Sequence, residues 1–315
     1  MRSLFDDRNI KPMLIAENVE PFDSPDWIYE FKWDGERCIA YLDPKTGTEL
    51  RNKRNVKMLP KVPELSEIHK QVRKPCILDG ELMCLVNGKP DFSVIQRRSL
   101  MSDAFKIGLE AKKYPATFIA FDILWLDGKN LMMQSLMERK KELSNNTKEN
   151  DRLAVSRYYD ESGTLLFKLA KRQGLEGIVG KRKDSVYLQS KRTKNWKKIK
   201  NLVDDDFVIC GYIHKENNMT SIVLGQYDRK GKLQYKGHVT LGVGGKAFQK
   251  IVQQCQISEP PILFPPGHGN ENAVWLTPTL VCTVEFMERT KNGGMRQPVF
   301  KGLRDDKEPQ DCVEK

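Results

Sequence analysis

Apolar residues in the first two hundred positions fall into short runs, several of which alternate with polar residues. Runs of this kind predict β-strands, because successive side chains of a strand point to opposite faces. The clearest predicted strands cover residues 26–32, 75–86, 116–126 and 175–182. No fixed period recurs along the chain, so a repeat architecture is not indicated.

Two segments between these strands carry helical spacing. One begins at Ser135 and has Glu138 three positions later, which is a capping-box start. The other, 163–174, ends at a glycine, a common helix stop. Strands mixed with helices in this order predict an α+β domain with antiparallel sheets. The second helix groups its apolar residues on one predicted face: Leu165, Leu166, Leu169 and Ala170.

The pattern changes after an acidic cluster at 204–206. From Phe207 onward the chain consists of short apolar runs separated by turn residues, which predicts a small β-barrel. The Pro- and Gly-rich stretch 257–272 is predicted to be a loop within that barrel. We therefore expect one domain over residues 1–202 and a second over 203–315.

Charge narrows the range of partners. Lys and Arg number 53 against 42 Asp and Glu, and the net charge of +11 suits a polyanion such as nucleic acid, although solubility alone would also account for it. No apolar run is long enough to span a bilayer, and the N-terminus lacks a signal segment, so a cytoplasmic protein without membrane contact is expected. Seven scattered cysteines and four histidines indicate neither disulfides nor zinc.

The stretch "YEFKWDGER" concentrates charge around one glycine. Glu30 and Lys32 lie two residues apart and so share a strand face. A tight turn at Asp34 and Gly35 would bring Arg37 back toward Lys32. Such a pocket suits a phosphate with a metal, and a surface hairpin with solvated salt bridges is an equally good interpretation of this run alone.

Other segments share this character. In "ILDGEL", Asp79 and Glu81 fall on one face, and in "EGIVGK", Glu176 precedes a glycine. Phe121 could stack on a base, although core packing is the commoner role of an isolated phenylalanine. In "NWKKIK", Lys198 and Lys200 share a strand face and would aim two ammonium groups at one point, which favours an anion between them over a solvated basic surface.

The ordered set "KWDGER", "LDGEL", "FDILWLDG", "EGIVGK", "NWKKIK" and "RDDK" resembles the six motifs of covalent nucleotidyltransferases. The residues within these motifs are most similar to those of ATP-dependent DNA ligases, in particular the ligase module of bacterial end-joining ligases. The resemblance covers nearly the whole chain and extends through "PDFSVIQRR" and "KDSVYLQSKRTKNWKKIK". It implies an adenylation (nucleotidyltransferase) domain followed by an OB-fold domain, with a hinge near residues 201–206.

The resemblance also implies a reaction. Lys32 would attack the α-phosphate of ATP to form a lysyl-AMP, the AMP would pass to a DNA 5′-phosphate, and a 3′-hydroxyl would displace it. Glu81 and Glu176 would support Mg²⁺, with Mn²⁺ as an alternative, and Glu81 would also hold the ribose. Glu30 would accept from the adenine amino group, and Arg37 would bind ribose and phosphate.

Further roles follow from the same resemblance. Phe121 would stack on the base, with Ile178 or Val179 on its other side. Lys198 and Lys200 would contact the phosphates. The last motif would reach the pyrophosphate during adenylation, and its matching residues are Arg304, Asp306 and Lys307.

The chain departs from the family pattern in the segment after the first motif. The usual Ser-Arg pair is replaced by "LRNKRNVKML", so Arg51, Lys53 or Arg54 is expected to bind the DNA phosphate. We expect no separate DNA-binding domain before residue 1, and therefore expect the two domains to hold DNA unaided unless a latch insert or a partner completes the clamp.

The main hypothesis is a monomeric DNA ligase acting on nicked or broken duplex DNA, with DNA-end-binding or repair proteins as candidate partners. An RNA ligase or capping-type guanylyltransferase would prefer RNA or GTP. A non-catalytic DNA-end-binding module would bind DNA without Lys32 and form no adduct. Paired acids and lysines are not needed for packing, which disfavours this last alternative.

Overall fold

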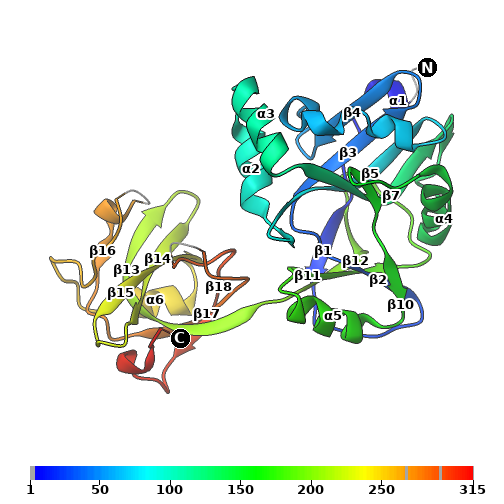
Figure 1. The fold of residues 1–315 in the computed structure, drawn as a ribbon. Helices are drawn as coiled ribbons and strands as arrows, with labels where there is room; N and C mark the ends of the chain where they lie inside the picture. Colours follow the sequence, from blue (N-terminus) through cyan, green and yellow to red (C-terminus); the bar gives the residue numbers. More distant parts are fainter. Residues whose placement is uncertain (1–3, 267–268, 291–292, 315) are drawn as a thin grey trace. The chain divides into compact units, whose positions relative to one another are not determined.

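The computed structural model describes residues 4–266, 269–290 and 293–314. The chain divides into two compact units, Met1–Asn201 and Leu202–Lys315, so the boundary lies one residue from the expected one (Figure 1). Each unit is built on its own β-sheets, and each is described separately below.

One sheet of the first unit has five strands in the order β1-β12-β11-β2-β10. All neighbours are antiparallel except β1 and β12, which are parallel. Three of the predicted strands contribute to it: "DWIYEFK", "LEGIVGKR" and "NWKKIK". Its strands are β1 (Leu14–Asn18), β2 (Trp27–Phe31), β10 (Tyr158–Asp160), β11 (Gly177–Arg182) and β12 (Arg192–Lys200).

The second sheet of this unit has seven strands, with β4-β3-β5-β7-β8 as its main path, β6 beside β5 and β9 beside β7. The long predicted strands at 75–86 and 116–126 are β5 and β7 at its centre. Its strands are β3 (Glu36–Asp43), β4 (Gly47–Asn52), β5 (Cys76–Val86), β6 (Lys89–Pro90), β7 (Ala116–Leu126), β8 (Lys129–Asn130) and β9 (Leu153–Val155).

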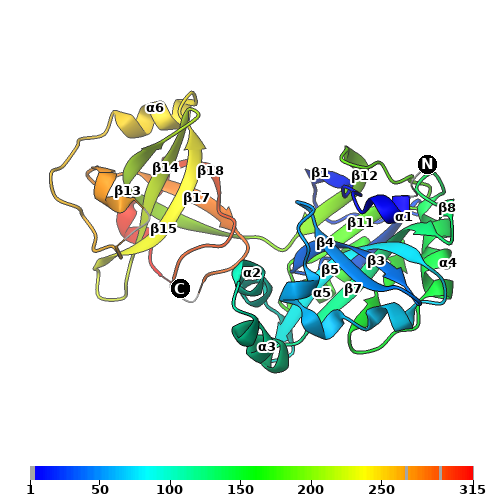
Figure 2. The same ribbon diagram turned by 90° about the horizontal axis from the view of Figure 1, so that it is seen from above.

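Helices cover the outer faces of the two sheets. Both predicted helices form, and the Ser135–Glu138 capping box is present at the start of the first of them. α2 and α3 follow each other and lie side by side in both ribbon views (Figures 1 and 2). The helices of this unit are α1 (Leu4–Asp7), α2 (Phe92–Leu100), α3 (Ala104–Lys113), α4 (Leu136–Asn146) and α5 (Gly163–Arg172), with short 3₁₀ turns at Leu59–Lys61, Pro63–Leu65 and Ile68–Gln71.

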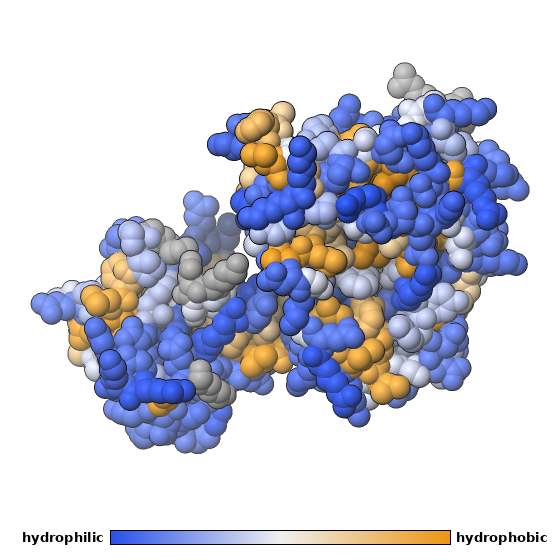
Figure 3. All heavy atoms as spheres, in the orientation of Figure 1, coloured by the Kyte–Doolittle hydropathy of each residue, from blue (hydrophilic) through white to orange (hydrophobic). Residues whose placement is uncertain are grey.

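The predicted apolar face of α5 is only half right. Leu166 and Ala170 are buried against the five-stranded sheet, whereas Leu165 and Leu169 are 69% and 38% exposed. The helix therefore buries a narrower stripe than its leucines suggested. Apolar side chains also gather on the outer surface of α3 (Figure 3), where Phe105 is 75% exposed.

A layer of apolar side chains joins the two sheets. Ile28 and Trp196 from the five-stranded sheet pack with Ile39, Ile77 and Leu124 from the seven-stranded sheet. The opposite face of the larger sheet packs on a separate core beneath α2 and the 3₁₀ turns. Phe121 of β7 belongs to this layer, and Glu30 lies in β2 of the other sheet, so both sheets contribute residues with predicted chemistry.

The predicted hairpin at Asp34 and Gly35 is wrong. β2 pairs with β10 and β11, whereas β3 pairs with β4 and β5, so the chain crosses from one sheet to the other at this point. Gly35 has an ordinary φ, but a Cβ there would lie 2.1 Å from the carbonyl oxygen of Leu82. Glycine is needed at this position for close passage over β5 rather than for a reverse turn.

The second unit is the predicted antiparallel β-barrel with OB-fold order. Its strands run β15-β14-β13-β17-β18, with β16 beside β13, and the outer strands β15 and β18 lie near each other, so the sheet nearly closes. The 257–272 stretch carries one short 3₁₀ turn (Asn270–Asn272) among its described residues. The elements are β13 (Val203–Lys215), β14 (Met219–Tyr227), β15 (Leu233–Gly242), α6 (Lys246–Val252), β16 (Val274–Trp275), β17 (Val281–Phe286) and β18 (Val299–Arg304), with a last 3₁₀ turn at Pro309–Asp311.

Two further expectations concern the whole chain. All seven cysteines are free thiols, and six of them are buried, as expected for packing residues. Among the helices in the described ranges, none has the length and apolar character required to cross a bilayer.

Candidate active site

Lys32 lies at the end of β2, beside the first residues of β11. Its backbone N–H donates to the carbonyl of Gly177 at 2.9 Å, and its ammonium group forms an ion pair with Glu176. Gly177 has a φ of +140°, and a Cβ there would lie 2.1 Å from the carbonyl oxygen of Ile199. Because only glycine fits this backbone, the glycine of "EGIVGK" brings the Glu176 carboxylate next to the Lys32 amine.

Glu30 lies two positions before Lys32, and its carboxylate is almost fully buried. Lys181 Nζ donates to Glu30 Oε1 at 2.9 Å, and Lys140 Nζ lies 2.6 Å from the same oxygen. Lys181 belongs to the "EGIVGK" strand, so strand pairing with β2 explains its position. Lys140 was not predicted, because it lies on α4, outside every motif.

Arg37 is fixed by an acid on the neighbouring strand. Two hydrogen bonds of 2.6 Å join its guanidinium group to Asp79, and the Tyr187 hydroxyl donates to the same carboxylate at 2.5 Å. Burial acts to lower the pKa of Arg37, but the Asp79 carboxylate outweighs it and raises that pKa above its ordinary value. The sequence did not single out Tyr187, although it lies within "KDSVYLQSKRTKNWKKIK".

Glu81 faces Arg37 across the β3–β5 ladder. Burial raises the pKa of Glu81 to about 8, with Lys32 and Arg37 opposing the shift and Glu176 adding to it. This carboxyl group is therefore mostly protonated at neutral pH in the free protein. A bound cation would favour its ionised form.

Phe121 lies in β7 within the layer between the sheets and is 9% exposed. Arg37 and Lys181 approach its ring, with Cζ and Nζ at 4.6 and 4.4 Å from the centroid. The aromatic ring expected to stack on a base therefore borders both the Arg37 and the Glu30 networks.

Of the two residues expected on the other side of the base, Ile178 is contradicted by the structure. Its side chain is fully buried with Leu166 under α5, on the far face of the sheet. Val179 pairs with Glu30 on one side and Lys198 on the other, so it shares their face. Strand alternation separates neighbours but does not say which of them faces the site.

Lys198 and Lys200 take the positions expected from their spacing. In β12 they lie opposite Val179 and Gly177, which places both next to the strand that follows Glu176. Burial lowers the pKa of Lys198, and the nearby charges of Lys200 and Lys32 lower it further. Positive charge is thus concentrated around the end of the Lys32 side chain.

The three DNA-phosphate candidates lie at the end of β4 and in the following turn. Arg51 donates to Glu49 at 2.6 Å and to the carbonyl of Asn55 at 3.1 Å. Lys53 and Arg54 are exposed in the turn. Arg51 therefore shapes this turn, while the other two present their charges to solvent.

The last motif is ordered within the second unit rather than a loose terminal loop. Arg304 donates to Asp306 through two hydrogen bonds of 2.7 Å, and the same pairing lowers the pKa of Asp306 to about 2. Lys307 donates to Asp206 at 2.6 Å, and Arg304 also reaches Asp206 at 3.5 Å. Asp206, in β13, thus holds both cations and was not identified from the sequence.

No group of three or more His, Cys, Asp or Glu side chains within residues 4–266, 269–290 and 293–314 is arranged to hold a metal ion. Glu176 lies close enough to Glu81 to add to the rise in the pKa of Glu81. Two carboxylates fit Mg²⁺ when phosphate oxygens and waters supply the remaining ligands, because this ion keeps several waters in protein sites. The donor set therefore fits a cation that arrives with a nucleotide.

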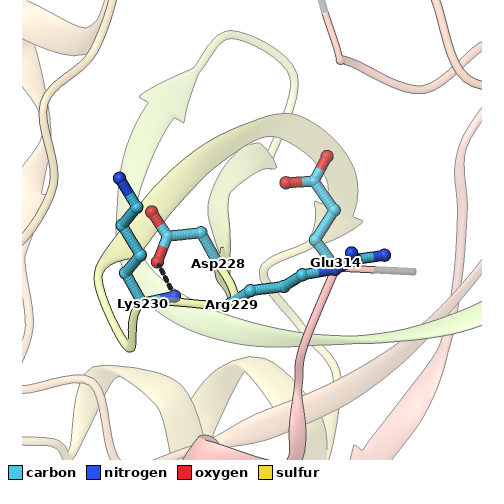
Figure 4. A pocket seen from close by; sticks show the side chains of 4 residues that line it. All are labelled: Asp228, Arg229, Lys230 and Glu314. Carbon is cyan, nitrogen blue, oxygen red and sulfur yellow. Dashed lines mark hydrogen bonds between the residues drawn. The ribbon is translucent and has the colours of Figure 1, made fainter.

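A shallow hollow in the second unit is a different kind of feature. It is lined by Asp228, Arg229, Lys230 and Glu314 (Figure 4). Asp228 accepts at 2.8 Å from the backbone N–H of Lys230 and at 2.9 Å from that of Lys232. These bonds close the turn between β14 and β15. Asp228 therefore has a structural role in this turn.

Comparison with known proteins bears on the whole chain. Residues 11–200 match the family described as ATP dependent DNA ligase domain, and residues 215–307 match the ATP dependent DNA ligase C terminal region. The multifunctional non-homologous end joining protein LigD of Mycolicibacterium smegmatis is 30% identical over 96% of this chain and 39% of its own length. The chain thus spans about two fifths of that relative.

Two further similarities involve proteins of comparable length. DNA ligase C1 of Mycolicibacterium smegmatis is 30% identical over 96% of this chain and 92% of its own length. A solved structure of a mycobacterial DNA ligase D complexed with ATP and MES has a TM-score of 0.57 and 27% identity, covering 98% of this chain and 99% of that one. With both domains matched and the first-unit motif residues Glu30, Arg37 and Phe121 brought together from its two sheets, the chain belongs to the ATP-dependent DNA ligase family.

Proposed function

We propose that this protein seals 5′-phosphate and 3′-hydroxyl ends of DNA in three steps, in which one AMP group is transferred twice and then released. Lys32 Nζ attacks the α-phosphate of ATP, forming a nitrogen–phosphorus bond as pyrophosphate leaves. The DNA 5′-phosphate then takes AMP from Lys32, and the DNA 3′-hydroxyl finally attacks the 5′-phosphate and releases AMP. The observation that carries this proposal is the contact of Lys32 with Glu176 beside the buried Glu30 and Arg37 networks.

The nucleophile must be a neutral amine, because an ammonium group has no free electron pair. Glu176 holds the Lys32 ammonium group in place before reaction. The crowded cations Lys198 and Lys200 favour loss of a proton from the cluster, since like charges disfavour the protonated forms. The same two ammonium groups then bind the phosphates of ATP.

The nucleotide lies between the two sheets in this proposal. Glu30 accepts from the adenine amino group, with Phe121 on one face of the base and Val179, in place of Ile178, on the other. Arg37, fixed by Asp79, binds ribose and phosphate. Mg²⁺ bound at Glu81 and Glu176 would supply positive charge that neutralises the phosphates.

The second unit contributes the last motif. Arg304 and Lys307 bind the departing pyrophosphate, and Asp306 fixes the Arg304 guanidinium group for that contact. A hinge at residues 201–206 would let this motif act in the first step only.

We place the DNA substrate in the context of strand breaks, because one relative carries non-homologous end joining in its name. Nicked and broken duplexes are both candidate substrates, and DNA-end-binding proteins are candidate partners. Lys53 and Arg54 are our choices for the DNA phosphate contact, ahead of Arg51. The reaction would take place in the cytoplasm, by a monomer.

The test is the intact mass of the protein after incubation with Mg²⁺ and, separately, ATP, GTP or NAD⁺. We expect a single AMP adduct from ATP that is absent in Lys32→Ala. The matched control is Lys197→Ala, since Lys197 lies on the other face of β12, near the rings of Phe22 and Trp27. The adenylated protein should then seal a nicked duplex that carries a 5′-phosphate.

Other results would redirect the assignment. A GMP adduct would indicate capping-type transfer, and sealing of RNA but not DNA would indicate an RNA ligase. Absence of any adduct, on protein first stripped of bound AMP, would leave only nucleic-acid binding.

A further inference from the structure

The carboxylate of Glu30 has an unusual environment for a buried acid. It is 2% exposed and contacts two ammonium groups, from Lys140 at 2.6 Å and from Lys181 at 2.9 Å, both at Oε1. Burial acts to raise the pKa of Glu30, but Lys140 and then Lys181 outweigh it and hold that pKa below its ordinary value. One lysine would suffice to pair the charge, so the second needs an explanation.

Lys140 is held in place by its neighbours on α4. The adjacent Arg139 is fully buried and forms two hydrogen bonds to Asp122 of β7, at 2.8 and 2.9 Å, and one to the carbonyl of Ser185 at 2.8 Å. These contacts fix the helix against the seven-stranded sheet. Lys140, itself 4% exposed, then reaches Glu30 in the other sheet.

Lys181 has a second neighbour that Lys140 lacks. Its Nζ lies 4.4 Å from the centroid of Phe121 and 4.5 Å from that of Trp196. Lys181 therefore contacts Phe121, the predicted stacking residue. A base that binds beside Phe121 would also contact the Lys181 ammonium group. Lys140 Nζ lies 5.8 Å from the ring centroid of a different residue, Tyr158.

We infer that Lys140 is a specificity-determining residue, which holds Glu30 as an ionised, correctly directed acceptor for the exocyclic amino group of a purine. This inference rests on the proposed function. An ionised carboxylate only accepts hydrogen bonds, whereas a neutral carboxyl group can also donate. With Lys140 in place, Glu30 binds a base that presents an amino group and rejects one that presents a carbonyl or a hydrogen atom at that position.

The ligand pair that tests this is ATP and purine riboside 5′-triphosphate, which has the same ring without the amino group. Equilibrium affinities for both are measured by calorimetry in a Lys32→Ala background, where no adduct forms. Adenylation of the chain with Lys32 intact is measured separately, so a failure of the proposed chemistry is distinguishable from a failure of this inference. Lys140→Met keeps the side-chain length and removes the charge.

We expect the Lys32→Ala protein to bind ATP about ten- to a hundredfold more tightly than the analogue, which is the range for a hydrogen bond to a charged group. Lys140→Met should reduce this preference to a few fold by weakening ATP, with little change for the analogue. Lys140→Arg should restore most of the preference. Lys141→Met, at the exposed adjacent position, should leave it unchanged.

Three results would overturn the inference. Equal affinities for the two nucleotides in the protein with Lys140 intact would show that Glu30 does not recognise the amino group. Parallel weakening of both nucleotides in Lys140→Met would show that Lys140 only supports the fold. An unchanged preference in that variant, with both affinities intact, would show that Lys181 holds Glu30 alone.

Discussion

The charged residues of the predicted sites in the two units differ in how deeply they are buried. In the first, Glu30 and its two lysines have side chains no more than 4% exposed, and Arg139 and Asp122 are fully buried. In the second, Arg304 and Asp306 are 38% and 69% exposed. The bond lengths are similar, so the difference lies in the surroundings.

This difference in exposure changes what an ion pair contributes to stability. Buried ion pairs lose much of their favourable energy to desolvation, but removing one partner leaves an uncompensated charge at large cost. Exposed pairs contribute little and exchange partners easily. The Glu30 and Arg139 pairs of the first unit are therefore fixed by burial, whereas Arg304 of the second unit can exchange Asp306 for another anion.

The largest effect is expected for Asp122→Ala. It leaves the fully buried Arg139 without its carboxylate partner, and we expect a loss of about 3–5 kcal/mol in the free energy of unfolding. Urea denaturation followed by tryptophan fluorescence measures it, because four of the five tryptophans lie in the first unit. A loss below about 1 kcal/mol would contradict the buried-pair account.

Arg304→Ala tests the exposed cluster. We expect formation of lysyl-AMP to slow about ten- to a hundredfold, since a charge-assisted contact to pyrophosphate is removed. Sealing of a nick that already carries AMP, and the thermal midpoint, should be unchanged. Lys301→Ala is the matched control, because Lys301 is exposed on the same strand and pairs with Glu285. Equal slowing of both reactions would argue against a role confined to the first step.

The pH dependence of the first step tests Glu81. Because its pKa is raised to about 8, the folded protein holds this proton below that pH, and a cation must displace it. The Mg²⁺ affinity in the presence of ATP should rise up to about tenfold per pH unit between pH 6 and 8 and then level off. Without ligands, the same shift makes the fold lose stability as pH rises from the ordinary glutamate range toward 8.

Glu81→Gln supplies the control for this profile. Glutamine keeps the size of the side chain and has no proton to lose in this range, so the rise with pH should disappear. A profile that persists in Glu81→Gln would assign the titration to another group.

The smallest effect is expected for Asp184→Ala. Asp184 pairs with Arg182 through two hydrogen bonds, and the two side chains are 66% and 47% exposed. We expect the free energy of unfolding to change by less than about 1 kcal/mol. A change as large as that of Asp122→Ala would remove the contrast between buried and exposed pairs, and 1 M salt should narrow the effect further.

Alternation and motif spacing predicted much of the first unit. The strand positions of Glu30, Lys198 and Lys200 follow from a period of two, and the capping box at Ser135 follows from local hydrogen bonding. These features depend on residues close together in the sequence. For the same reason, the β-barrel pattern after Phe207 was recognisable.

Features that depend on pairing between distant segments were missed. The chain at Asp34 and Gly35 was read as a hairpin because turn chemistry does not say which sheet the next strand joins. The sequence left Ile178 and Val179 as alternatives, because strand alternation does not say which face of the sheet borders the site. Lys140 lies 110 positions from Glu30 by their numbering, and no local pattern connects a helix surface to a buried strand.

Residues 32–35, which cross from one sheet to the other, also fix the number of residues between β2 and β3. Lys32 follows the end of β2 and Glu36 begins β3, so residues 32–35 alone join a strand of one sheet to a strand of the other. One inserted residue would displace the chain by about 3.3 Å, which exceeds the precision that an attacking atom requires. In a library of insertions and deletions, this segment should therefore tolerate fewer length changes than the turn at 53–55, even where single substitutions at Asp34 are accepted.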